Sequence, residues 1–192
     1  MGYTAKDFSF LLGMPGFSDT LLKNHFTLYQ GYVTNTNKVM EELNTLLKEG
    51  KQGTPAFAEL KRRFGWEFNG MRLHELYFGN LGGSGDPAKA PNLLKRVAAQ
   101  FGSVELCTQD FQATATMRGI GWVILYEDLE SGVLFNQWIN EHDVGHPAGA
   151  NPILVLDVFE HAFMTDYGLK RADYIAAFFK NVKWEVAEER LT

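Results

Sequence analysis

The first third of the chain repeats its apolar residues at the spacing of an amphipathic helix. Ser18 is a favourable N-cap residue, and from Asp19 to about Lys48 an apolar side chain recurs every three or four positions. This pattern predicts one long helix, with a bend near Thr34–Asn37.

A second helical repeat follows a glycine-containing loop at Lys48–Thr54. Its apolar positions run from Phe57 to Phe78, and Gly65 and Gly70 interrupt them. Because the connecting loop is short, the two helices are expected to form a hairpin.

Glycine and proline concentrate in residues 79–91, where the helical pattern stops abruptly. We therefore expect two domains, an N-terminal helical hairpin at 1–83 and a C-terminal α/β domain at 92–192.

The C-terminal part mixes helical patterns with short runs of β-branched and aromatic residues. The strand candidates are 122–126, 133–139 and 153–157, and the helix candidates are 92–101, 103–118, 171–179 and 184–191. The expected fold class is α+β, with a small three-stranded antiparallel sheet after the hairpin.

Composition narrows the class of protein. At 192 residues and 45% hydrophobic content the chain can bury a sizeable core. Its net charge is -5 and its basic residues are dispersed, so we expect neither a nucleic acid nor a membrane as partner. Cys107 is the single cysteine, and no targeting leader is recognised, so the expected compartment is the reducing cytoplasm.

The chain has only five histidines: His25, His74, His142, His146 and His161. His25 and His74 lie in the two helices of the hairpin, among residues expected to face the core. Imidazoles from adjacent helices can converge on one ion. The simpler interpretation is that each ring bonds a carbonyl in the core.

A third segment favours the metal. Asp157 ends the most apolar strand candidate, and His161 follows four residues later. A carboxylate at the end of a buried strand is costly unless it is paired or bound to a cation. Three imidazoles and one carboxylate suit first-row ions such as iron, manganese or zinc, and this set leaves hydrolysis, oxygenation and electron transfer open.

The sequence DVFEHAF at 157–163 resembles the D-x-W-E-H metal-binding signature of iron/manganese superoxide dismutases, with Phe159 at the tryptophan position. The resemblance continues in the same order along most of the chain, through HFTLYQGYVTNTN, LHELYF, GIGW and NVKWE.

This resemblance implies one iron or manganese ion per subunit, held between the two parts of the fold by His25, His74, Asp157 and His161. The implied reaction disproportionates superoxide to dioxygen and hydrogen peroxide by one-electron cycling of the ion. The resemblance also implies a homodimer or homotetramer, in which Glu160 bonds His161 of the partner subunit.

The resemblance assigns two further residues to catalysis. Tyr32 resembles the family's gate tyrosine, and His142 resembles the histidine that some members use to hold the bound solvent, which leads us to expect iron slightly ahead of manganese. Tyr32 follows His25 by seven residues, two turns of a regular helix, so we predict an undistorted α-helix there. His142 and His146 could instead be surface histidines of a loop.

Two aromatic residues complete the expectations. Trp122 is expected to line the metal pocket, and Tyr174 resembles an interface residue. Two other classes of protein stay open: a mononuclear non-haem metal oxygenase or hydrolase, and a non-catalytic metal-binding relative of the same fold.

Overall fold

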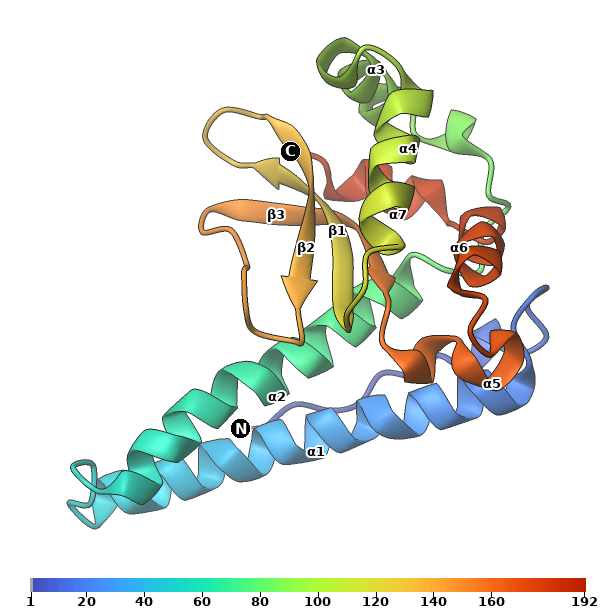
Figure 1. The fold of residues 1–192 in the computed structure, drawn as a ribbon. Coiled ribbons are helices and arrows are strands. Elements are labelled where there is room, and N and C mark those ends of the chain that lie inside the picture. The colour runs from blue at the N-terminus through green and yellow to red at the C-terminus, as the bar shows by residue number, and fades with distance from the viewer. Residues whose placement is uncertain (1) are drawn as a thin grey trace.

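A computed structural model describes residues 2–192. Two long helices, α1 (Asp19–Lys48) and α2 (Pro55–Gly79), pack against each other as the predicted hairpin (Figure 1). The Ser18 and Thr54 side chains cap their N-termini by accepting hydrogen bonds from backbone N–H groups of the first turn. Helix α1 is continuous through Thr34–Asn37, so the expected bend introduces no break.

Helix α2 also continues without interruption through Gly65 and Gly70. Gly70 has a packing function instead of ending the helix. A Cβ atom at Gly70 would lie 2.6 Å from the ring of Tyr32 on α1, so only glycine allows this close approach of the helices.

Three antiparallel strands form the predicted sheet, in the order β2-β1-β3. They are β1 (Gly121–Asp128), β2 (Leu134–Asn140) and β3 (Ala150–Asp157). The central strand β1 is buried along nearly its whole length, as its run of large apolar residues requires. In this register Trp122 pairs with Asp157, which brings an indole beside the end of β3.

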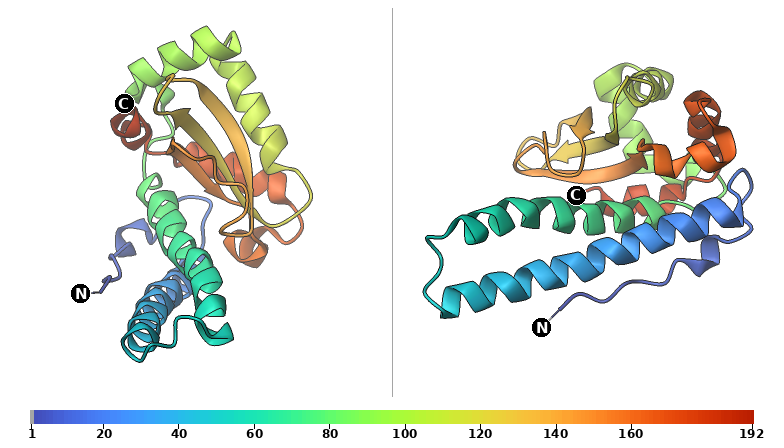
Figure 2. Two further views of the ribbon diagram at one scale, coloured as in Figure 1. Left: turned by 90° about the vertical axis from the view of Figure 1, so that its left-hand side faces the viewer. Right: turned by 60° about the horizontal axis from the view of Figure 1, so that its bottom comes forward.

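Five helices accompany the sheet: α3 (Pro91–Phe101), α4 (Val104–Ala115), α5 (Met164–Tyr167), α6 (Arg171–Lys180) and α7 (Trp184–Arg190). Helix α4 packs against β1 and β2, α7 packs against β3, and α2 approaches β3 from the hairpin. Figure 2 shows the hairpin as one side of the molecule and the sheet with its helices as the other.

The C-terminal part differs from the sequence prediction at the end of α4 and at α5. Helix α4 ends at Ala115 rather than Arg118, and Arg171 donates to the carbonyls of Met117 and Gly119 at 2.7 and 2.9 Å, which holds this segment outside the helix. The short helix α5 was not predicted. Its four residues are too few to show a hydrophobic period.

One continuous core joins the two parts of the fold. Leu22 and Phe78 of the hairpin belong to the same buried cluster as Trp122 and Leu156 of the sheet. Among residues 2–192, none of the helices combines the length and the apolar character needed to cross a membrane.

Candidate metal centre

Four side chains from three separate segments meet between the hairpin and the sheet. His25 comes from α1, His74 from α2, Asp157 from the last position of β3, and His161 from the 3-10 turn Glu160–Ala162 that follows. Each offers one ligand atom, and these atoms all lie within 4.8 Å of one another. The set predicted from sequence is therefore brought together.

One carboxylate oxygen lies at the middle of this cluster. Asp157 Oδ2 lies 3.1 Å from His25 Nε2, 3.2 Å from His161 Nε2 and 3.7 Å from His74 Nε2. The other oxygen, Oδ1, accepts the backbone N–H of Phe159 at 2.9 Å, which fixes the orientation of the carboxylate.

The His74 ring gives the strongest indication that a cation belongs here. Its Nδ1 lies 2.5 Å from the Gly70 carbonyl oxygen, which only accepts hydrogen bonds, so Nδ1 carries the proton. Nε2 then presents a lone pair to Asp157, and this buried nitrogen has no hydrogen-bond partner among residues 2–192. A lone pair facing a carboxylate oxygen is repulsive unless a cation lies between them. Three imidazoles and one carboxylate fit a first-row transition ion.

The pKa shifts of Asp157 and His74 agree with this arrangement. Burial alone would raise the pKa of Asp157, but the charges and hydrogen bonds of His161 and His25 outweigh it and lower this pKa. Burial lowers the pKa of His74 well below its ordinary value, so its ring is neutral, as a metal ligand must be.

His142 lies beside the cluster and its hydrogen bonds define its tautomer. The indole N–H of Trp122, which can only donate, contacts His142 Nδ1 at 3.0 Å. The proton of the neutral ring is therefore on Nε2, which donates to the Tyr32 hydroxyl at 2.7 Å. Burial lowers the pKa of His142 to about 4, which keeps the ring neutral.

Tyr32 reaches the centre from a regular helix. Helix α1 has ordinary α geometry between His25 and Tyr32, as the spacing of seven predicted. The Tyr32 ring stacks on the His74 ring, with centroids 5.3 Å apart. Burial raises the pKa of Tyr32 to about 12, so its hydroxyl stays protonated at neutral pH.

Several packing contacts of the cluster were not predicted from sequence. Trp66 packs its ring 4.7 Å from that of His142, and Phe159 stacks on His142 at 4.7 Å and on His161 at 5.1 Å. Gly70 supplies the carbonyl that orients His74. In the sequence Gly70 stands out only because it precedes His74 by one helical turn. A glycine at such a position normally indicates only a lower helix propensity.

Two expectations concerned an interface. Glu160 is exposed on the surface of the chain. Tyr174, in contrast, is fully buried and donates to the backbone carbonyl of Asp157 at 2.8 Å, while its oxygen lies 3.0 Å from the Tyr77 hydroxyl. The prediction that Tyr174 is an interface residue is wrong, since it has no surface to offer a partner. Instead it supports the end of β3.

His146 does not reach the ligand cluster. Its Nε2 lies 2.9 Å from the backbone oxygen of His142, and its Nδ1 lies 2.9 Å from the hydroxyl of Tyr126.

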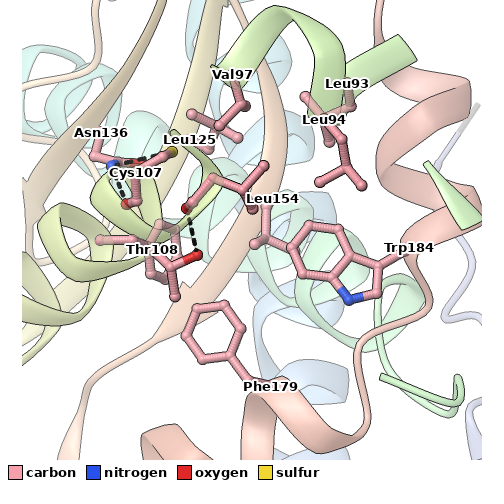
Figure 3. A pocket seen from close by; sticks show the side chains of 12 residues that line it. Leu93, Leu94, Val97, Cys107, Thr108, Leu125, Asn136, Leu154, Phe179 and Trp184 are labelled. Atoms are coloured by element: carbon pink, nitrogen blue, oxygen red, sulfur yellow. Dashed lines mark hydrogen bonds between the residues drawn. The ribbon is translucent and has the colours of Figure 1, made fainter. Parts of the chain in front are cut away.

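A separate small cavity of about 30 Å³ lies between α3, α4, α7 and the sheet (Figure 3). Its lining is mostly apolar, includes Cys107 and Trp184, and contains none of the four ligand residues. It belongs to the packing of the C-terminal part.

The fold and the cluster are those of a mononuclear metalloprotein, in which the four residues could hold one ion between a helical hairpin and a small antiparallel sheet. Residues 89–190 match the family model for iron/manganese superoxide dismutases, C-terminal domain. The chain belongs to the iron/manganese superoxide dismutase family.

Curated relatives extend this similarity to the hairpin. "Superoxide dismutase [Fe]" of Aquifex pyrophilus is 38% identical over 92% of this chain and 85% of the relative. "Superoxide dismutase [Mn] 2" of Haloferax volcanii is 37% identical over 89% of this chain and 85% of the relative, and "Superoxide dismutase [Fe]" of Cupriavidus metallidurans is 37% identical over 92% and 89%.

Proposed function

We propose that this protein is a superoxide dismutase whose iron or manganese ion is held by His25, His74, Asp157 and His161. The assignment of the site rests on three imidazole Nε2 atoms that converge on one oxygen of the Asp157 carboxylate. The Nε2 atom of His74 has no hydrogen-bond partner within 2–192. When bound, the ion supplies one-electron chemistry, taking an electron from one superoxide and passing it to the next.

The residues around the site contribute the protons of the reaction. Two superoxide anions and two protons give one dioxygen and one hydrogen peroxide, so each cycle consumes two protons. Because His142 Nε2 donates to the Tyr32 oxygen, the Tyr32 hydroxyl proton is free to point elsewhere, toward the centre. In this proposal Tyr32 delivers each proton and is reprotonated from solvent, while His142 holds the Tyr32 hydroxyl in place.

Identity to the relatives does not decide between the two metals, since relatives named for iron and for manganese match almost equally well. The histidine at position 142 leads us to propose iron slightly ahead of manganese. Metal analysis of protein purified from cells supplied with both ions, followed by reconstitution of the apoprotein with each, decides the preference.

The test of the function is an assay of superoxide removal on the purified, metal-loaded protein, with the apoprotein as control. We expect removal that depends on iron or manganese. Metal-loaded protein without dismutation would contradict the proposal and favour a non-catalytic relative.

We also propose that a second copy of the chain covers the surface next to His161. The His161 side chain is 24% exposed, whereas the other three ligands are buried. Beside it, Glu160 and Phe163 line a groove with the exposed apolar side chains of Met164 and Leu169. In the proposed homodimer Glu160 accepts a hydrogen bond from His161 of the partner subunit.

Sedimentation of the purified protein tests this proposal. We expect at least a dimer, with a tetramer as the alternative, and Leu169→Arg should shift it toward the monomer. The control Leu47→Arg changes an exposed residue in the last turn of α1 and should leave the assembly unchanged. A monomer at micromolar concentration would contradict the interface.

The division into domains at 1–83 and 92–192 stays a proposal. It is supported by the glycine- and proline-rich connection between them, although one core spans both parts. Limited proteolysis should cut first within 84–91, and the two fragments should remain associated.

A cytoplasmic location is likewise proposed. It is supported by the single cysteine, Cys107, which is buried as a free thiol. Cell fractionation with an antibody against the protein tests it.

A further inference from the structure

The loop that carries His142 has a strained backbone. It connects β2 to β3, and Glu141, directly before His142, has φ +54°, the one non-glycine residue within 2–192 with a positive φ. Such a conformation persists only where surrounding contacts enforce it. The backbone bonds exchanged by Asn140 and Val144 close the turn, but they do not involve His142 itself.

His146 provides the contact that reaches the His142 backbone. The carbonyl oxygen of His142 can only accept, so His146 Nε2 carries a proton and donates to it at 2.9 Å. The other ring nitrogen, Nδ1, lies 2.9 Å from the hydroxyl of Tyr126, within hydrogen-bond distance. Among the residues that the structure describes, no other group donates to this carbonyl.

Strand β1 thus holds the loop at two points. Trp122 bonds the ring of His142 directly, and Tyr126, four residues further along the same strand, bonds its backbone through His146. One contact fixes the imidazole and the other fixes the peptide that bears it. The orientation of the His142 ring toward Tyr32 depends on both.

We propose that His146 is a positioning residue for the dismutation reaction: by holding the His142 carbonyl, it keeps the His142 ring bonded to Tyr32. This inference rests on the proposed function. Loss of the N–H donor lets the loop relax, and the 2.7 Å bond from His142 to Tyr32 lengthens or breaks. The four ligand residues are not touched, so the ion stays bound.

Two variants of the holoenzyme with side chains of similar length isolate the hydrogen bond. His146→Gln keeps an amide N–H that can donate to the His142 carbonyl, whereas His146→Met has no donor. Val144→Ala, an exposed position of the same loop, is the matched control. Metal content, the visible absorption spectrum of the bound ion and the rate of superoxide removal are measured for each variant.

We expect all three variants to retain about one ion per chain. The Met variant should show a shifted absorption spectrum and a rate roughly 10-fold lower, in the range of groups that orient a metal site from outside. The Gln and Val144 variants should stay close to the unsubstituted protein.

Equal behaviour of the Gln and Met variants would overturn the inference, and so would loss of the ion or of folding in both, because His146 would then have only a structural role. The absorption spectrum separates this inference from the proposed function. A spectral difference between the Gln and Met variants in a protein that does not remove superoxide leaves the positioning of His142 standing and rejects the activity.

Discussion

The histidines of this protein form two groups, which differ in whether their ring nitrogens have hydrogen-bond partners in the protein. In the loop, each ring nitrogen of His142 and His146 lies within hydrogen-bond distance of another protein group. In the ligand cluster, three Nε2 atoms share one carboxylate oxygen, and that of His74 has no partner within 2–192. The role of a histidine is therefore decided by what faces its nitrogens, since both groups contain buried as well as partly buried rings.

The two groups also differ in how their geometry is held. The four clustered residues lie on α1, on α2, at the end of β3 and on the 3-10 turn that follows it, all parts of regular elements. The loop histidines depend on side-chain bonds to strand β1. Substitutions in the cluster should therefore change metal retention, and substitutions in the loop should change the chemistry at a retained ion.

The largest effect is expected for His25→Ala. Removing one of four ligands should lower metal affinity by at least about 100-fold, more than the loss of an outer hydrogen bond. Metal analysis after dialysis checks this, and Asn24→Ala, the exposed neighbouring residue on α1, should keep the ion. Full retention of metal by the His25 variant would show that the cluster is not the site.

His142→Ala should have the converse effect. The ion should be retained, and superoxide removal should fall roughly 10- to 100-fold because Tyr32 loses the donor that orients its hydroxyl. His142→Gln, whose amide N–H can still donate to Tyr32, should recover part of the rate. A His142→Ala variant that loses its metal would place His142 among the ligands and remove the distinction between the two groups.

Gly70→Ala tests whether the approach of the hairpin helices supports both groups. Its Cβ would lie 2.6 Å from the Tyr32 ring, so the free energy of unfolding should fall by about 1–3 kcal/mol. At Gly31, an exposed position of α1 with no neighbouring atom within 4 Å, alanine should instead raise it by about 0.5–1 kcal/mol. Urea unfolding of the two variants measures the difference, and equal effects would contradict the tight contact.

The smallest effect is expected at Cys107, a buried thiol that belongs to neither group of histidines. Burial raises the pKa of its thiol to about 11, so in the native protein at pH 8 it should resist alkylation, while the urea-unfolded chain reacts. Because the unfolded thiol ionises near pH 9, the free energy of unfolding should decline as pH rises from about 9 toward 11. Cys107→Ser should make that decline shallower, since buried tyrosines such as Tyr32 also contribute to it. Rapid native labelling would show that the thiol is accessible.

Much of the fold could be predicted because its signals are local. The period of apolar residues and the cap at Ser18 define α1, and the β-branched runs define three strands in one antiparallel sheet. The four residues that cluster could be named from sequence because a carboxylate ending an apolar strand is costly without a partner, and because the segment resembles the family's metal-binding signature. Their role as ligands stays a prediction. Helix spacing also predicted correctly that Tyr32 aligns with His25.

Only the tertiary structure decided the partners of each polar group. The sequence places His142 and His146 in one loop but does not give their partners. The indole of Trp122 defines the tautomer of His142, and the carbonyl of His142 fixes a proton on Nε2 of His146. Tyr174 was assigned to an interface, yet it is buried against the end of β3. Elements follow from periods that the chain carries locally, whereas hydrogen-bond partners depend on how separate segments pack.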